Sequence, residues 1–200
     1  MLAALSLILF VVCYRILGFW HGDFVNFAPA MALVFCGALY AGHFRKLWIA
    51  PLVGLLLSDL YLNAQYGAPL FSASMVAIYL AYLLALPIGF WIARHKSALT
   101  ILGGCLGASV LFYVLTNTAS WLANPAYAVS LGGWWQALTV GMPGFPPTWM
   151  FFRSSVLSDL LFTGAFVVAM ESVLAARGKP SLLPWANQPA GSPEGETAAG

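Results

Sequence analysis

The sequence predicts an all-α membrane protein with six transmembrane helices and with both termini in the cytoplasm. Of its 200 residues, 62% are hydrophobic and only 7% are charged, whereas about a quarter of the residues in a soluble domain are charged. Six apolar segments approach the roughly 20 residues that cross a bilayer. Basic residues fall in alternate loops between these segments. This composition excludes a soluble enzyme and a disordered chain. A net charge of +2 without a basic cluster argues against nucleic-acid binding.

The predicted spans follow one another closely along a single transmembrane domain, residues 1–179. The first lacks the basic start and the small-residue cleavage site of a signal peptide, so we expect a retained helix. The second, third and sixth are short or interrupted, and the fourth and fifth are long and uncharged. Residues 180–200 are rich in Pro, Gly, Ala, Ser and Glu, which is typical of a disordered tail. The six spans are residues 2–20, 27–42, 47–63, 69–93, 97–122 and 152–170.

The basic residues of the short loops predict the orientation, because cytoplasmic loops are enriched in Lys and Arg. One side of the membrane carries six of them, and the other carries only Arg15 and Arg153, both at span ends. We therefore expect the loops after the first, third and fifth spans to face outward. The six that share a side are Arg45, Lys46, Arg94, Lys96, Arg177 and Lys179.

The last outward segment, residues 123–151, is long and aromatic. It contains Tyr127, Trp134, Trp135 and Trp149. One interpretation is an aromatic belt at the membrane interface, where Trp and Tyr are enriched. The other is a lid or a short re-entrant helix over a pocket, because loops of this length are usually functional or disordered.

Two carboxylates lie inside predicted spans, and both occur in the tetrapeptide Leu-Ser-Asp-Leu. Asp59 belongs to residues 57–60 and Asp159 to residues 157–160. The spacing suggests an internal repeat of three spans, which would make the two halves inverted. A carboxylate in mid-membrane costs about 2.5–3.5 kcal/mol on insertion scales, so neither is expected to face lipid. Each carboxylate either bonds to a neighbouring helix or frames a polar cavity.

Further polar residues lie at the same outward level. Asn26 opens the second span, Asn117 and Trp121 end the fifth, and Arg153 opens the sixth. Capping and headgroup anchoring would explain each singly, but their coincidence predicts an outward pocket for a small organic ligand. The candidate ligand-binding residues are Asn26, Asp59, Asn117, Trp121, Tyr127, Trp134, Trp135, Arg153 and Asp159.

The three cysteines, Cys13, Cys36 and Cys105, lie in apolar runs without a Cys-x-x-Cys pair. Disulfides and structural zinc are therefore not expected. The sequence predicts neither a metal site nor a bound cofactor. Small-residue pairs such as Gly37 and Ala41 permit close helix packing, either within the chain or against a partner protein.

Several motifs together resemble DUF6580, a family of uncharacterised bacterial six-helix membrane proteins, over residues 26–173. The motifs are Asn26-Phe27-Ala28-Pro29, Pro51-Leu52 to Ser58-Asp59, Thr116-Asn117 to Trp121, and Ser158-Asp159-Leu160. That family in turn resembles the S components of energy-coupling-factor (ECF) vitamin transporters. This resemblance implies a multi-pass protein of the bacterial cytoplasmic (inner) membrane, with a vitamin-like ligand bound under its outward loops. It also implies an ECF coupling subunit with ATPases as partner.

Two features of the sequence limit the S-component resemblance. No Walker A motif occurs, so another chain would supply the energy. Solitary S components that import cobalamin use an outward cysteine, and here the nearest is Cys13 in the first span. That puts a cobalt–thiolate site in doubt and leaves a cobalamin ligand open.

Three classes of function compete at this point. We expect a non-enzymatic binding or uptake protein embedded in the lipid bilayer. The alternatives are a structural or assembly protein, such as a rod-shape factor of the MreD type, and an intramembrane enzyme. An enzyme is least favoured, because the two aspartates lack a Gly-x-Gly-Asp motif and no His-Glu-x-x-His motif occurs.

Overall fold

The computed structural model is a bundle of helices and describes residues 2–21, 29–67, 69 and 72–182. In chain order the described helices are α1 (Leu2–His21), α2 (Ala30–Leu39), α3 (Ala50–Tyr66), α4 (Ala73–Ile92), α5 (Ala98–Ala123), α6 (Leu131–Leu138) and α7 (Thr148–Ala176). These residues contain no strand. The predicted all-α class is therefore confirmed.

Hydrogen bonds at the helix ends explain several boundaries. Ser72 and Ser130 begin α4 and α6 by accepting backbone N–H groups of the first turn, and Ser97 and Thr100 form a reciprocal capping box at α5. Gly67 ends α3 with φ +62°, a left-handed conformation that favours glycine.

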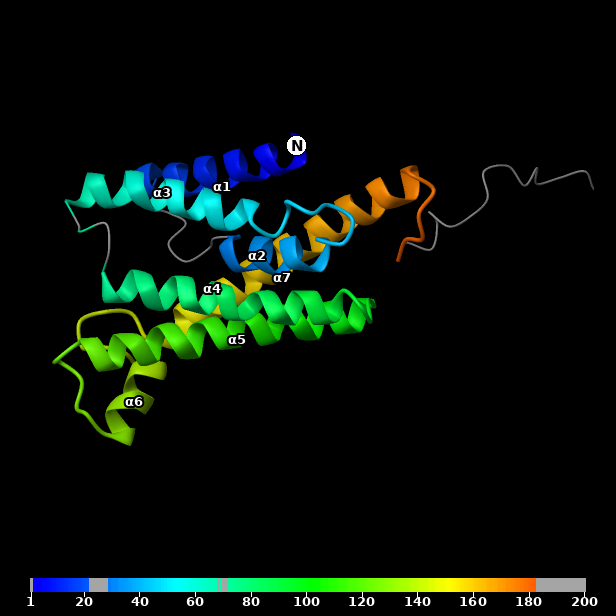
Figure 1. The fold of residues 1–200 in the computed structure, drawn as a ribbon. Helices are drawn as coiled ribbons and strands as arrows, with labels where there is room; N and C mark the ends of the chain where they lie inside the picture. Colours follow the sequence, from blue (N-terminus) through cyan, green and yellow to red (C-terminus); the bar gives the residue numbers. More distant parts are fainter. Residues whose placement is uncertain (1, 22–28, 68, 70–71, 183–200) are drawn as a thin grey trace, which may run out of the picture.

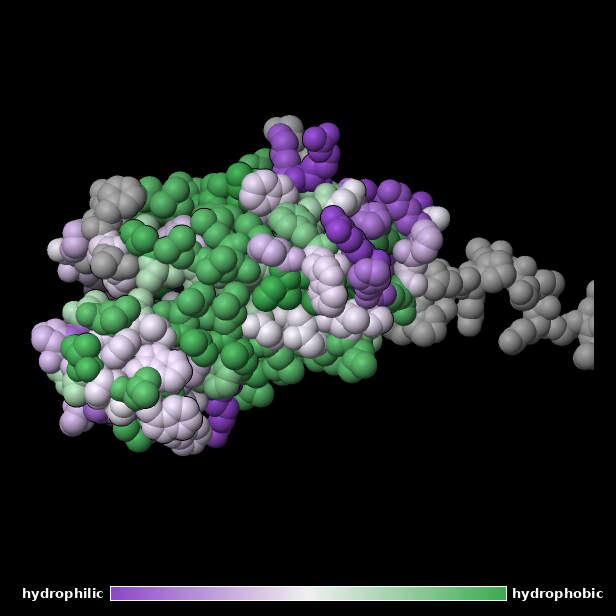
Figure 2. Space-filling view, turned by 60° about the horizontal axis from the view of Figure 1, so that its bottom comes forward, coloured by the Kyte–Doolittle hydropathy of each residue, from purple (hydrophilic) through white to green (hydrophobic). Residues whose placement is uncertain are grey.

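Three helices are long and apolar enough to cross a membrane: residues 74–92, 98–123 and 148–176. The apolar helices over residues 4–20 and 30–39 are shorter. Large hydrophobic side chains also cover much of the outer surface, including Leu80 on α4, Leu102 on α5 and Leu161 on α7 (Figure 2). An apolar exterior of this extent suits a lipid environment.

The helices form two pairs with a short helix between them (Figure 1). α1 packs on α3, and α4 packs on α5. α2 lies between the pairs and contacts α3, α4, α5 and α7, so that all its residues after Ala30 are buried. At 1.5 Å per residue its ten residues cover about 15 Å, half of a bilayer core. The predicted second span, 27–42, thus contains a shorter helix, Ala30–Leu39. Residues 22–28 lie outside the described part of the chain.

Small residues allow this close packing around α2. A Cβ atom on Gly89 of α4 would lie 2.7 Å from the Phe35 carbonyl oxygen, and one on Gly37 would lie 2.6 Å from the Leu47 carbonyl oxygen. The small residues at these two positions therefore serve packing within the chain. Gly103 and Gly107 of α5 face open space instead.

The polar ends of the bundle differ. The α2–α3 and α4–α5 turns and the end of α7 lie at one end, on the right in Figure 1, with the N-terminus of α1. This basic end carries the hydrophilic side chains that gather on the right of Figure 2. The other end, called the α6 end, contains the end of α5, all of α6 and the start of α7.

Two helices, α7 and α6, differ from the spans predicted from the sequence. α7 runs from Thr148 to Ala176 rather than over 152–170. Within the aromatic segment 123–151, α6 forms a helix of eight residues that packs against α5. The predicted disordered tail lies outside the described residues from position 183 on.

Candidate functional site

Asp159 of α7 is more deeply buried than Asp59 of α3. Its side chain is 3% exposed. One carboxylate oxygen accepts a hydrogen bond of 3.1 Å from the Ala32 backbone N–H, and the other accepts one of 2.6 Å from the Ser109 hydroxyl. Ala32 lies in the first turn of α2, whose own N-cap residue, Pro29, forms no side-chain cap. Asp159 therefore caps α2 from α7, where the positive end of a helix dipole favours an anion.

A polar cavity of about 220 Å³ extends from Asp159 between α5 and α7. Its walls combine aromatic rings with hydroxyl and amide groups. The ring centroids of Tyr113 on α5 and Phe152 on α7 lie 4.4 Å apart. The Tyr113 hydroxyl donates a hydrogen bond to the Leu138 carbonyl of α6. We call this the Asp159 cavity. Its lining residues are Ser109, Phe112, Tyr113, Thr116, Asn117, Thr148, Phe151, Phe152, Ser155 and Asp159.

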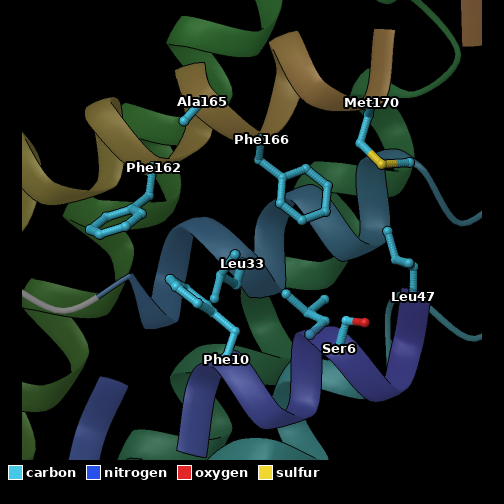
Figure 3. Close-up of a pocket in the computed structure, with 9 residues that line it drawn as sticks. Ser6, Phe10, Leu33, Leu47, Phe162, Ala165, Phe166 and Met170 are labelled. Atoms are coloured by element: carbon cyan, nitrogen blue, oxygen red, sulfur yellow. The ribbon is translucent and has the colours of Figure 1, made fainter. Parts of the chain in front are cut away.

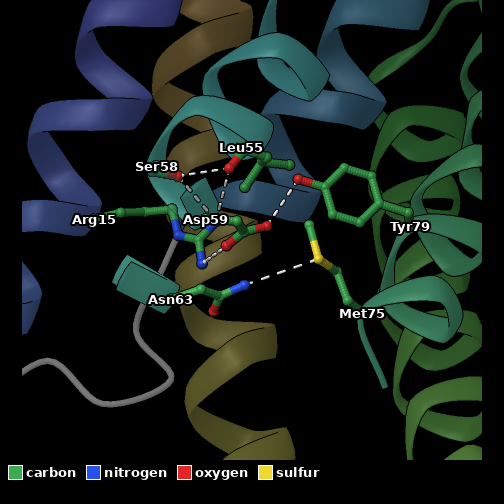
Figure 4. A network of polar contacts seen from close by, with 7 residues as sticks. All are labelled: Arg15, Leu55, Ser58, Asp59, Asn63, Met75 and Tyr79. Carbon is green, nitrogen blue, oxygen red and sulfur yellow. Dashed lines mark hydrogen bonds and ion pairs between the residues drawn. The ribbon is translucent and has the colours of Figure 1, made fainter. Parts of the chain in front are cut away.

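Asp59 lies in a different network between α1, α3 and α4 (Figure 4). Arg15 forms an ion pair with it at 2.6 Å, and the Tyr79 hydroxyl donates to its second oxygen at 2.8 Å. Arg15 also donates to the Ser58 hydroxyl at 3.0 Å. The carboxylate of Asp59 is thus neutralised by a cation from a neighbouring helix.

The Asp59 network borders a second polar cavity of about 290 Å³. Ser72, Ser74, Asn63 and Arg15 contribute polar groups to its wall. Phe112 lines both this cavity and the Asp159 cavity, and its ring stacks on Tyr82 with centroids 5.0 Å apart. The two carboxylates therefore occupy neighbouring cavities that share the wall residue Phe112.

The structure distributes the predicted site residues over several places. Asn117 and Asp159 line one cavity and Asp59 the other. Trp121 donates to the Ala128 carbonyl and holds the α5–α6 connection to α5. Trp134 of α6 donates to the Thr118 hydroxyl of α5 and joins these two helices.

The other predicted residues that the structure describes do not line the Asp159 cavity. Tyr127 is buried beside α6, whereas Trp135, at 63% exposure, and Arg153 lie at the surface. Asn26 lies outside the described residues. The aromatic segment thus contributes structure around the cavity rather than its walls, apart from Thr148 and Phe151.

A third carboxylate with hydrogen-bond partners inside the bundle, Glu171, was not predicted from the sequence. It is fully buried near the basic end, where Lys96 lies 2.6 Å and the Tyr40 hydroxyl 2.7 Å from its Oε1 atom. Its Oε2 atom accepts the Leu182 backbone N–H at 2.7 Å. These bonds join the end of α2, the α4–α5 turn and the residues after α7. Hydrophobic segments of the sequence end before Glu171, and no sequence signal indicates its partners.

The cysteines match no metal centre. Cys36 and Cys105 are buried, and Cys13 is exposed on α1. Among the described residues, no three His, Cys, Asp or Glu side chains lie close enough to hold a metal ion.

The fold and the sites together define a helical bundle of the membrane-protein type, with polar cavities at the α6 end. The chain belongs to DUF6580, a family of unknown function, whose model matches residues 1–182. No curated protein and no solved structure matches the chain.

Proposed function

We propose that this protein binds a small vitamin-like solute in the Asp159 cavity and takes part in its uptake across the bacterial cytoplasmic membrane. The observation that carries the proposal is the cavity itself: a buried carboxylate, hydroxyl and amide groups, and aromatic rings line a space between α5 and α7. Mostly apolar walls with a few oriented polar groups are typical of small-molecule sites.

The location of the cavity supports an outward-facing site. The α6 end lies opposite the basic turns, and basic loops favour the cytoplasm. We therefore place the α6 end outside and both termini inside, with α1, α2, α3, α4, α5 and α7 as the six membrane segments. α6 would lie at the outer surface, beside the cavity.

The dimensions and chemistry of the cavity define the ligand class. A volume of about 220 Å³ lies below the 300–1,000 Å³ of typical drug-sized sites. A single-ring heteroaromatic solute fits this size, and a corrinoid does not. The Tyr113 and Phe152 rings contact each other, with centroids 4.4 Å apart, and together form one aromatic wall that suits stacking by a planar group. Asp159 and Asn117 favour a ligand with hydrogen-bond donors or a positive nitrogen.

Ligand-dependent stability offers a test on the full-length protein in lipid nanodiscs. Pyridoxine and nicotinamide, which each have one heteroaromatic ring, are the probes, because a ligand that binds only the folded state raises its unfolding temperature. We expect at least one probe to raise it, and Thr116→Trp, which fills the cavity, to remove the effect.

The matched control is Leu122→Trp, at a 69% exposed position of the same helix. It should preserve the ligand effect. If no probe stabilises the parent protein, or if Thr116→Trp and Leu122→Trp respond alike, the binding proposal is wrong. A structural or assembly role would then be the better reading.

A further inference from the structure

A third hollow, which is apolar, lies on the side of the bundle between α1 and α7 (Figure 3). Its volume is about 420 Å³, and Leu33 of the buried helix α2 is among its walls. Among its described lining residues, only Ser6 has a polar side chain. We call this hollow the lateral groove. Its lining residues are Ser6, Leu7, Phe10, Leu33, Leu47, Phe162, Ala165, Phe166 and Met170.

The lateral groove begins at a cluster of aromatic rings between α1 and α7. α1 packs on α3, and its ring contacts with α7 lie at Phe162. Phe10 lies 6.3 Å and Tyr14 5.6 Å from the Phe162 ring, measured between centroids. From this ring cluster towards the basic end, the groove runs between Ser6 of α1 and Met170 of α7. The groove is thus bounded by aromatic rings near the middle of the bundle.

The basic end of the groove carries an excess of positive charge. Leu47 lines the groove and directly follows Arg45 and Lys46, which are both exposed. The Arg177 guanidinium lies 5.0 Å from the ring of Phe44, the residue before Arg45.

His43, in the same turn, lies close to two further cations, Lys96 and Lys179. Partial burial lowers the pKa of its imidazole, and the nearby ammonium groups of Lys96 and Lys179 lower it further. Glu171 pairs with Lys96 and is the only carboxylate that the described residues bring to this end. The charges of Arg45, Lys46, Arg177 and Lys179 are therefore left without an acidic counterpart among the described residues.

We infer that the lateral groove and these basic residues together bind an anionic phospholipid. One acyl chain would occupy the apolar groove, and the phosphate would lie at Arg45 and Lys46. Basic pockets between membrane helices on the cytoplasmic side bind anionic headgroups, and a groove whose lining is apolar apart from Ser6 suits a hydrocarbon chain. The site is separate from the Asp159 cavity, so this inference does not depend on the proposed uptake function.

Native mass spectrometry of the full-length protein tests this inference. The probes are phosphatidylglycerol and phosphatidylcholine with identical acyl chains, and glycerol phosphate without chains. We expect at least a fivefold preference for phosphatidylglycerol over phosphatidylcholine, and no retention of glycerol phosphate. Arg45→Ala combined with Lys46→Ala should remove the preference, whereas Arg94→Ala, at the exposed α4–α5 turn, should keep it.

The groove is tested separately from the charges. Ala165→Trp places a large ring in the groove and should reduce phosphatidylglycerol retention at least fivefold. Gly164→Trp, at an exposed position of the same helix that faces away from the groove and has open space around it, is the matched control and should leave retention unchanged. The unfolding temperature of each variant separates lost binding from lost folding, and Ser6→Trp replaces Ala165→Trp if the latter does not fold.

Three outcomes would overturn the inference. The first is equal retention of the two lipids by the parent protein. The second is binding of glycerol phosphate as strong as that of phosphatidylglycerol, which would mean a headgroup site without the groove. The third is a groove variant that keeps its lipid but changes the oligomeric state of the protein, which would assign the groove to a protein partner.

Discussion

The tetrapeptide Leu-Ser-Asp-Leu occurs in α3 and again in α7, and the structure gives its two copies different roles. In α3, Asp59 forms an ion pair with Arg15 and accepts from Tyr79. In α7, Asp159 has no cationic partner among the described residues and binds the α2 backbone and Ser109. Asp59 is also the more accessible, since its side chain is 15% exposed.

The two serines of the repeat differ in the same way. Ser58 accepts from Arg15 and donates to the Leu55 carbonyl at 2.8 Å. Ser158 is equally buried, but its hydroxyl has no hydrogen-bond partner among the described residues. Identical local sequence thus leads to a satisfied network in one helix and an unsatisfied hydroxyl in the other. The helix that packs against each copy decides the difference.

The largest effect is expected for Asp159→Leu. This change removes the cap of α2 and leaves the Ala32 N–H without its acceptor. It also removes the shorter hydrogen bond of the Ser109 hydroxyl, which keeps the Cys105 carbonyl as an acceptor. We expect a loss of about 2–4 kcal/mol in the free energy of unfolding, because both bonds involve a charged group in a buried site. The amount of folded, monodisperse protein after heating in detergent measures the loss.

Asp159→Asn is the control for this prediction, because an amide retains one acceptor oxygen. It should cost less than half as much as Asp159→Leu. If both variants fold as well as the parent protein, the cap does not stabilise α2, and Asp159 serves the cavity alone.

A smaller loss of stability is expected at Asp59, and a second substitution should restore part of it. Asp59→Leu should cost about 1–2 kcal/mol, because it leaves the cation of Arg15 unpaired beside a polar cavity that partly solvates it. Adding Arg15→Leu should restore part of the loss, since removing both charges is milder than removing one. Unfolding temperatures of the two single variants and the double variant give the coupling free energy.

The corresponding double variant at Asp159 sharpens the contrast. Asp159→Leu with Ser109→Ala should recover little, because the Ala32 N–H of α2 still lacks an acceptor. Equal recovery at the two sites would mean that both carboxylates act in the same way, contrary to the structure.

The smallest effects are expected at the serines. Ser58→Ala should destabilise the fold by about 1 kcal/mol, since two hydrogen bonds are lost. Ser158→Ala should be neutral or slightly stabilising, because it removes a buried hydroxyl without a partner. The difference between the two unfolding temperatures is the measurement, and a larger loss for Ser158→Ala would contradict the comparison.

Much of the fold could be predicted from apolar segment length. Each of the six predicted spans coincides in large part with a helix among α1–α5 and α7. Segment length could not predict that α2 would be short and central. Long and short apolar segments were both predicted to be transmembrane helices, so length did not separate α2 from the others. Nor could it predict α6, whose eight residues lie in an aromatic stretch that also suits a membrane interface.

The candidate site was predicted in part. The depth of Asp59 and Asp159 indicated protein contacts, and both aspartates have them. The partners were not predicted: Arg15 was assigned to a span end, and Tyr79 and Ser109 gave no signal. The tryptophans were expected as ligand contacts, but the structure gives Trp121 and Trp134 hydrogen bonds to the chain itself.

The sequence by itself determined the class of the protein, because few charges and long apolar segments leave a helical membrane bundle as the solution that satisfies the backbone. It also determined which ends are basic. Only the tertiary structure decided what each polar residue does. Asp59 and Asp159 have the same neighbours in sequence, yet one faces the guanidinium of α1 and the other faces the N-terminus of α2. Such pairings depend on which helices pack together, and that packing is set by small residues and side-chain shape across the whole bundle.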